Sequence, residues 1–405
     1  MKKLVLAAAT ALICGAVQPA AAEFTGGVIK IGVLNDMSGI YSDFQGPGSV
    51  IAAQMAVEDF GGKVNGTSVE VLAADHQNKP DVGMAIARQW LDKDGVDVIM
   101  DLPNSAIALA VNEVVREKNS VFIGIGAGTD LLTGEKCSPN TVHWVYDTWA
   151  DANSLARAAS RAGAKSWYFV TADYAFGYAV EKQAIRAVEQ EGGKVLGSVR
   201  HPLGTMDFSS FVLQAQASKA QAIGIASAGG DVTSVIKQAK EFGITQGGQK
   251  LVALIFQINS VQALGLETTQ GLLTVSPFYW DQNAETRAFA KRFQERHKKH
   301  AVPNEMHAGM YSAVTHYLKS LQALGSDGDG RAVVAKMKEL RTKDQLFGEG
   351  YVREDGRKMH PMHLIEVKTP AESKGEWDYF KILSTIPAEE SFRPLAEGNC
   401  PMIKK

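Results

Sequence analysis

The residues best suited to bind a small molecule lie in loops that follow short apolar runs. Asn104 and Ser105 come directly before a predicted helix over 107–115. Either residue can act as the helix N-cap, and that role alone explains a short polar side chain there. A helix N-terminus also offers free backbone N–H groups and a positive dipole end to an anion. The loop is therefore a candidate anion site, with Ser105 as its main side chain.

Aromatic residues occupy equivalent loops elsewhere in the chain. Tyr41 and Phe44 follow the first predicted strand, and Tyr174 and Phe176 follow a strand in the second half. Aromatic rings offer a ligand large apolar surfaces. We expect Tyr41 to contact a ligand and Phe176 to close over it. The alternative for the first pair is that one ring packs against the protein itself.

A glycine-rich loop at 124–129 follows another predicted strand. A dinucleotide site is one interpretation, but no acidic residue stands at the expected distance on a following strand. Gly128, between Ala127 and Thr129, has no Cβ, which would let the main chain of this loop approach a ligand closely. The three residues are candidates for the binding site.

These loops are held by alternating strands and helices. The predicted strands are 28–34, 69–73, 96–100 and 121–125, then 167–170, 195–199, 222–226 and 252–256. Such alternation predicts an α/β fold with two doubly wound parallel sheets, separated by a break at 126–148. In open α/β sheets ligands bind at the carboxyl ends of strands, which adds Gly229 and Gln257 to the candidate site. Late helices and a hairpin of strands 348–353 and 362–367 must complete the two units.

The N-terminus predicts export. Lys2 and Lys3 precede an apolar run over 4–17, and small residues follow at 20–22. This pattern is typical of a signal peptide over 1–22, cleaved near Ala22, and the run is too short to span a bilayer. We therefore expect a periplasmic protein.

Charge and motifs exclude several function classes. Removing Lys2 and Lys3 changes the formal net charge from -2 to -4, which argues against nucleic acid or an anionic membrane as partner. The sequence holds no P-loop, nucleophile elbow or zinc-protease motif, so we expect no enzyme. Its histidine pairs lack acids or cysteines spaced for a metal, and neither a metal nor a cofactor is expected.

Cys137 and Cys400 are the cysteines that remain after cleavage. In an oxidising compartment the pair is a candidate disulfide that would fix the C-terminal tail to the body. Two free thiols are the alternative.

Several segments resemble one known family. They are 29–39 (IKIGVLNDMSG), 46–48 (GPG), 58–62 (EDFGG), 75–81 (DHQNKPD) and 173–177 (DYAFG). Together and in this order they resemble the leucine/isoleucine/valine-type substrate-binding proteins of ABC transporters. The resemblance covers nearly the whole mature chain, although no single segment is specific.

This resemblance implies a type I periplasmic-binding fold, with two lobes joined by a hinge that the chain crosses three times. Lobe one would comprise 23–145 plus 277–350, and lobe two 146–276 plus 351–405. A small ligand would bind in the cleft, and the lobes would close over it. The partner would be an inner-membrane ABC permease, and we expect the carrier to be a monomer.

The resemblance also assigns roles within the site. It places the ligand carboxylate at Ser105, opposite Ala127 and Gly128. Gln257 stands where amino-acid binders of the family carry a glutamate that pairs with the ligand ammonium group. Because burying an ammonium without a paired charge is costly, we predict a small organic acid, foremost an aromatic carboxylate. The alternatives are a branched-chain or other neutral amino acid, and a role as a ligand-sensing module.

Overall fold

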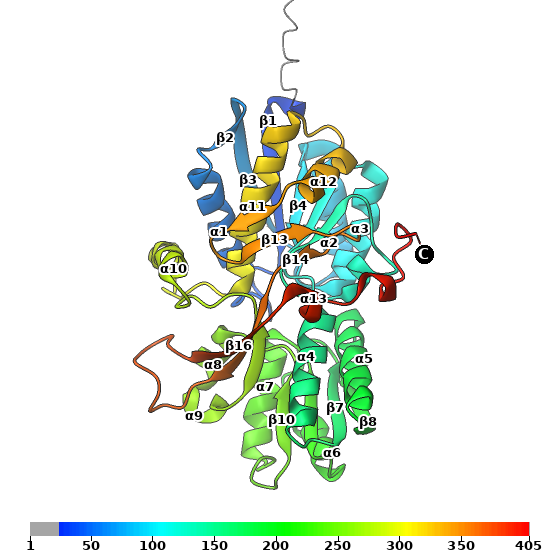
Figure 1. Cartoon of the computed structure of the whole chain (residues 1–405), viewed down its shortest axis with the longest axis vertical. Coiled ribbons are helices and arrows are strands. Elements are labelled where there is room, and N and C mark those ends of the chain that lie inside the picture. Colours follow the sequence, from blue (N-terminus) through cyan, green and yellow to red (C-terminus); the bar gives the residue numbers. More distant parts are fainter. Residues whose placement is uncertain (1–23, 405) are drawn as a thin grey trace, which may run out of the picture.

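The computed structural model describes residues 24–404 and shows two lobes stacked along the long axis of the molecule (Figure 1). We call the upper lobe in this view lobe one and the lower lobe two. The predicted signal peptide 1–22, with its cleavage point at Ala22, lies outside the described residues. No helix within 24–404 is long and apolar enough to cross a membrane.

Lobe one is built on a six-stranded sheet in the order β2-β3-β1-β4-β5-β6. All neighbours are parallel except β2 and β3. The central strands β4 and β5 are buried at every position, because helices cover both faces of the sheet. The strands are β1 (Val28–Asn35), β2 (Lys63–Val64), β3 (Thr67–Asp75), β4 (Val98–Asp101), β5 (Val121–Gly124) and β6 (Thr141–His143).

Two helices from distant parts of the chain, α1 and α11, pack side by side in this lobe (Figure 1). α11 thereby brings its N-terminus down to the junction between the lobes. The helical segments around this sheet are η1 (Thr25–Gly27), α1 (Gly46–Asp59), α2 (Pro80–Gln89), η2 (Trp90–Asp94), α3 (Ser105–Lys118), η3 (Asp130–Thr133), α10 (Ala284–Arg296), α11 (Glu305–Leu324) and α12 (Gly330–Glu339).

Lobe two contains a four-stranded, fully parallel sheet in the order β10-β9-β7-β8. Its strands are β7 (Ser166–Ala172), β8 (Lys194–His201), β9 (Ala222–Ala226) and β10 (Lys250–Ala253). Its helices are α4 (Thr148–Arg161), α5 (Ala175–Gln190), α6 (Ser209–Ala217), α7 (Gly229–Glu241), α8 (Ile258–Leu264) and α9 (Leu266–Thr269). The predicted α/β fold with two parallel-sheet lobes is confirmed.

The late strands pair differently from the sequence prediction. β13 (Gly348–Val352) pairs with β14 (Lys358–Met359) and β12 (Thr342–Asp344). β15 (Met362–Val367) pairs instead with β11 (Leu273–Ser276) and β16 (Phe380–Ile386). The predicted hairpin of 348–353 with 362–367 is therefore wrong. Pro361 has no backbone N–H and fixes its own φ, so the strand after the turn ends early and the chain starts a new sheet.

The C-terminal segment returns to lobe one. It includes α13 (Ala388–Ser391) and η4 (Leu395–Glu397), and it ends in the predicted disulfide between Cys137 and Cys400. Not all of the predicted second-lobe range 351–405 lies in lobe two. Arg357, directly before β14, forms a parallel bridge with His143 of the lobe-one strand β6. The division of the remaining chain between the lobes stays a prediction.

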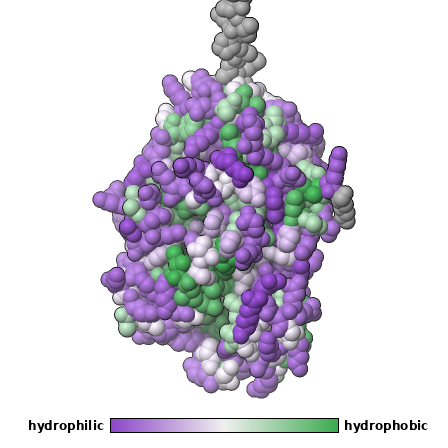
Figure 2. Space-filling model, in the orientation of Figure 1, coloured by the Kyte–Doolittle hydropathy of each residue, from purple (hydrophilic) through white to green (hydrophobic). Residues whose placement is uncertain are grey.

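The surface in the view of Figure 2 is mostly hydrophilic, with an apolar area near the middle. Large apolar side chains exposed in the described part include Ile382 and Leu383 of β16.

Candidate functional site

The two lobes touch across the cleft, so the cleft is closed. The backbone N–H of Gly230 in lobe two donates to the carbonyl of Ile40 in lobe one at 3.1 Å. Asn259 donates from its side chain to the carbonyl of Asp43 at 3.0 Å. Asn304, the N-cap of α11, donates to the carbonyl of Phe44 at 2.8 Å. The first two contacts join the first loop of lobe one to the helix starts of lobe two, and the third joins the same loop to α11 within lobe one.

The predicted aromatic residues meet between the lobes. The hydroxyls of Tyr41 and Tyr174 are hydrogen-bonded to each other across the cleft. Tyr41 also packs edge-to-face on Phe44, and Tyr174 packs on Phe176 with ring centroids 5.9 Å apart. Tyr41, Phe44 and Phe176 are buried. The structure therefore brings all four rings together, whereas their role as ligand contacts stays a prediction.

Gly128 and Gly229 allow the lobes to approach closely. A Cβ on Gly128 would stand 2.6 Å from the ring of Phe176 and 2.8 Å from the hydroxyl of Tyr146. A Cβ on Gly229 would stand 2.4 Å from the carbonyl oxygen of Ile40, and the φ of Gly229 is +60°. All three distances are shorter than van der Waals contact, so a larger residue at either position opposes closure.

The loop before α3 resolves the roles of Asn104 and Ser105. Asn104 is the N-cap, because its side-chain oxygen accepts hydrogen bonds from the N–H groups of Ala106 and Ile107 at 3.0 and 3.3 Å. The hydroxyl of Ser105 is buried and has no hydrogen-bond partner within the described residues. A buried hydroxyl without a partner is costly, which favours a ligand group as its partner.

A buried hydrogen-bond network holds the strained backbone at the start of this loop. Asp101 and Leu102 have φ values of +87° and +60°, which are unfavourable for residues with a Cβ. The carboxyl of Asp101 receives hydrogen bonds from Asn35 at 2.6 Å and from Gln45 at 2.5 Å. Burial raises the pKa of Asp101 to about 7. This buried network fixes the strand end from which the Ser105 loop leaves the sheet.

The remaining predicted residues also follow the carboxyl ends of strands, Ala127 and Thr129 after β5 in lobe one and Gln257 after β10 in lobe two. Ala127 and Thr129 are fully buried in the loop after β5. The carbonyl of Ala127 is hydrogen-bonded to His143, and the hydroxyl of Thr129 accepts from the N–H of Leu131 at 3.4 Å. Gln257 precedes α8 as its N-cap residue and is buried, and its side-chain oxygen has no partner within the described residues.

Two buried acids, of which Glu305 lies beside Gln257, were missed by sequence reasoning. Asp151 lies in the first turn of α4, and Glu305 is the first residue of α11. Burial raises the pKa of Glu305 to about 7, and the Gln257 side chain opposes that shift. Burial and then the nearby Glu305 hold the pKa of Asp151 well above its usual range. An acid in the first turn is common in any helix because of the dipole, so sequence alone gave no signal of their meeting.

Tyr146 connects these acids to the glycine loop. Its hydroxyl donates to the carbonyl of Gly126 at 3.1 Å, and burial holds its pKa well above its usual range, with Asp151 the next cause. The first amide of α4, at Thr148, donates to the carbonyl of Gly128 at 2.7 Å. The start of α4 and the loop 126–128 are therefore in direct contact.

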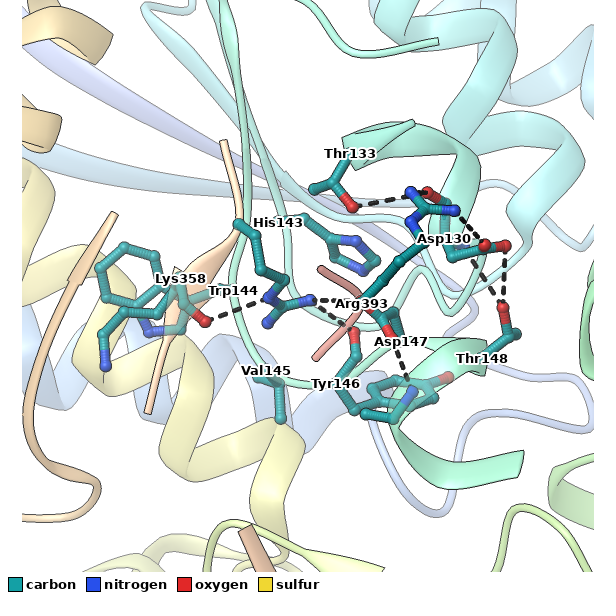
Figure 3. A network of polar contacts seen from close by, with 12 residues as sticks. Asp130, Thr133, His143, Trp144, Val145, Tyr146, Asp147, Thr148, Lys358 and Arg393 are labelled. Atoms are coloured by element: carbon teal, nitrogen blue, oxygen red, sulfur yellow. Dashed lines mark hydrogen bonds and ion pairs between the residues drawn. The ribbon is translucent and has the colours of Figure 1, made fainter. Parts of the chain in front are cut away.

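A separate polar network connects the segments near the junction of the two lobes (Figure 3). Arg393 of the C-terminal segment forms an ion pair with Asp130 at 2.6 Å, and Thr148 donates to the same carboxyl at 3.2 Å. Gln183 of lobe two donates to Asp130 at 2.9 Å. Arg357 is fully buried, donates to the carbonyl of Tyr146 at 2.9 Å and lies 3.6 Å from Asp147.

Comparison with known proteins agrees with this fold. A family model described as a periplasmic binding protein matches residues 28–376. A periplasmic binding protein from Burkholderia mallei is 50% identical, with a TM-score of 0.91 and coverage of 93% of this chain and 100% of that chain. A branched-chain amino acid ABC transporter ligand-binding protein from Burkholderia xenovorans is 39% identical, with a TM-score of 0.81 and coverage of 92% and 99%.

A more distant relative matches over most of its length. The Leu/Ile/Val-binding protein homolog 6 of Brucella abortus is 26% identical over 366 residues, which are 89% of this chain and 92% of that protein. This family consists of solute-binding proteins that work with an ABC permease. The chain belongs to the periplasmic binding protein family, and it is a substrate-binding protein of an ABC transporter.

Proposed function

We propose that this protein captures a small organic carboxylate with an apolar body between its two lobes and delivers it to an inner-membrane permease. The observation that carries the proposal is the buried, unpartnered hydroxyl of Ser105 in the closed cleft. A ligand carboxylate accepts a hydrogen bond from such a hydroxyl and from any backbone N–H left free at a helix N-terminus.

The rings around the cleft suit an apolar ligand body. Tyr41, Phe44, Tyr146, Tyr174 and Phe176 come from both lobes, so a ligand held among them stabilises the closed form. The sequence favours an aromatic carboxylate without an amino group, because Gln257 replaces an acid. A neutral amino acid is the second candidate, and the buried acids Asp151 and Glu305 favour it.

The rest of the transport role is proposed on the same basis. We expect the signal peptide to be removed near Ala22, so that the mature chain works in the periplasm as a monomer. A monomer leaves both lobes free to dock on a permease. Size-exclusion chromatography with light scattering measures this directly, and a stable dimer would contradict it.

The ligand class is tested by thermal unfolding of the mature protein with a panel of amino acids, benzoates, phenylpropanoates and short aliphatic acids. A ligand that binds only the folded state raises the unfolding temperature by mass action. We expect at least one carboxylate to do so, and its uncharged amide to fail. A panel in which no carboxylate stabilises the protein would contradict the proposed function.

A further inference from the structure

We propose that lobe one carries a second binding site, outside the cleft, for a small oxyanion such as sulfate or phosphate. The site is a cavity between α11 and β12, with the side chain of Lys358 behind its inner wall. None of the residues that line it belongs to the candidate cleft site, so this inference does not depend on the proposed function.

The cavity is large enough for a polyatomic ion. Its volume is about 180 Å³, whereas a water molecule takes about 30 Å³ of liquid. The lining comes from α11, from residues 341–345 around β12, and from Trp144, which follows β6. Because α11 and β6 both belong to lobe one, we expect the cavity to persist when the cleft opens.

The rim of the cavity carries three cations. Lys319, Arg341 and Lys343 line it and are exposed, and none of them forms an ion pair within the part of the chain that the structure describes. Glu349 stands opposite Lys343 on β13, but it forms no ion pair there. The guanidinium of Arg341 lies over the ring of Tyr351, 4.7 Å from its centroid, which limits its motion. An anion between such cations relieves their mutual repulsion.

Lys358 adds a buried cation. Its side chain is 0% exposed, and its Nζ has no hydrogen-bond partner among residues 24–404. This Nζ lies 5.3 Å from the ring centroid of Trp144 (Figure 3). A Cβ on Gly350 would stand 3.1 Å from the Nζ and 3.0 Å from the hydroxyl oxygen of Thr342, so these two atoms lie close together. Because Trp144 and Thr342 both line the cavity, the ammonium group lies directly behind its wall.

Asp344 is the one acid that lines the cavity among the described residues, but it does not neutralise Lys358. The two side chains form no ion pair there. The carboxyl of Asp344 instead accepts from the hydroxyl of Ser312, and from the N–H groups of Leu346 and Phe347 at 2.7 and 3.2 Å. Asp344 therefore holds the turn after β12. The buried ammonium still needs an acceptor, because a buried charge without a partner is costly.

The free polar groups at the cavity are mostly donors. The hydroxyl of Thr342 is buried without a partner in the described residues, and the side chains of Lys358 and Arg341 offer charged N–H groups. A fully ionised oxyanion offers only acceptors, and hydrogen bonds between charged donors and oxyanions are among the stronger ones in proteins. These donors therefore favour an anion over a cation or a neutral ligand.

The first experiment titrates the mature protein with sulfate and with phosphate by isothermal titration calorimetry at pH 7.5. Chloride keeps the ionic strength constant, so that general screening does not change during the titration. We expect one ion to bind per chain with a Kd of about 1 mM or lower. Absence of binding up to about 10 mM of either ion would overturn the inference.

Variants assign the binding to the cavity. Lys358→Met keeps the apolar stem but removes the charge, and it should weaken sulfate binding at least about ten-fold. Arg341→Ala removes an exposed charge and should weaken it about three-fold. Arg331→Ala is the matched control, because Arg331 is an exposed arginine on α12 that neither lines the cavity nor forms an ion pair in the described residues. Unchanged sulfate affinity in both test variants would overturn the inference.

The cleft is separated from this site by a pair of reciprocal measurements. Ser105→Ala should leave sulfate affinity unchanged, and Lys358→Met should leave the response to the carboxylate panel unchanged. Loss of sulfate binding in Ser105→Ala would place the anion in the cleft and overturn the inference. If no carboxylate of the panel binds but sulfate binds as expected, the proposed function fails and this inference stands.

Proton uptake gives a readout that a purely structural role of Lys358 would not produce. Burial lowers the pKa of Lys358 to about 8, with Asp344 opposing the shift and Arg357 adding to it. His316 and His360 also face this group, and burial lowers the pKa of both. A bound anion favours the charged amine, so sulfate binding should take up protons at pH 8 and weaken from pH 7 to 9. Lys358→Met should show neither effect, and sulfate binding without proton uptake in the wild type would overturn the inference.

Discussion

Buried carboxyl groups near the junction of the lobes fall into two sets with opposite surroundings. Asp130 at the hinge has an arginine, a glutamine and a threonine around it, so its charge is paired. Asp151 and Glu305, in the first turns of α4 and α11, are buried to a similar degree, but no cation pairs with them within residues 24–404. Burial alone therefore does not distinguish structural from functional acids.

The difference indicates which acids serve stability. A paired buried charge resists removal of either partner, because the other is left without compensation. A buried carboxylate without a cation destabilises the folded protein. Such a residue is retained only where another property of the protein, such as its function, depends on it. Four measurements test this contrast.

Arg393→Ala should have the largest effect. It leaves Asp130 buried without its cation, which costs about 3–5 kcal/mol of unfolding free energy. Chemical denaturation measures this loss. Arg161→Ala, which removes an exposed ion pair with Glu191, is the control and should change stability little. A loss no greater than that of the control would show that the hinge pair is not structural.

Removing the disulfide should cost slightly less. The Cys137→Ser/Cys400→Ser variant loses a crosslink between residues 263 apart, worth about 2–4 kcal/mol. The thermal midpoint should fall in the variant, and a reductant should lower the midpoint of the wild type alone. If the reductant shifts neither, the tail is held by its ion pairs rather than by the crosslink.

Ser105→Ala should weaken ligand binding while the fold persists. A hydrogen bond to a charged carboxylate contributes about 1.5–3 kcal/mol, so affinity should fall about 10- to 100-fold. Ser160→Ala is the matched control, because Ser160 is another buried hydroxyl without a partner in the described residues, in the last turn of α4. Equal effects in both variants would remove Ser105 from the binding site.

Glu305→Gln should have the smallest effect on the ligand-free protein, and of opposite sign. Because the folded pKa of Glu305 is raised to about 7 from 4.5, the proton it keeps stabilises the fold fully below about pH 4.5, and this contribution is lost as the pH rises to about 7. Removing the charge should therefore stabilise the protein by about 1–2 kcal/mol at pH 8 and hardly at pH 4. Thermal unfolding across this range measures it. Destabilisation at pH 8 would show that the acid is already compensated.

The sequence predicts the strands and helices of the fold well, because local patterns of apolar residues determine them. Runs of β-branched residues such as 28–34 become buried strands, and the loops that follow them meet at one edge of each sheet. The positions of Tyr41, Ser105 and Phe176 in the cleft follow from that rule. The pairing of β13 with β14 was not predicted, because two short strands were possible partners and only Pro361 separates them.

The sequence did not reveal the two unpaired buried acids, for a different reason. Asp151 and Glu305 are separated by more than 150 residues, and each looks like an ordinary first-turn acid. Their meeting depends on how α4 and α11 pack around the hinge. For the same reason the sequence left Asn104 and Ser105 equivalent, whereas the hydrogen bonds of Asn104 identify it as the cap.

The position of the crosslink has a consequence for biosynthesis. Cys400 is made 263 residues after Cys137, which belongs to the first lobe. The covalent ring can therefore close only after both lobes have been synthesised. A chain that is truncated before residue 400 leaves Cys137 as a free thiol, which alkylating reagents can label. Oxidation of this pair thus marks a chain that was synthesised at least as far as residue 400, and it separates such chains from shorter fragments.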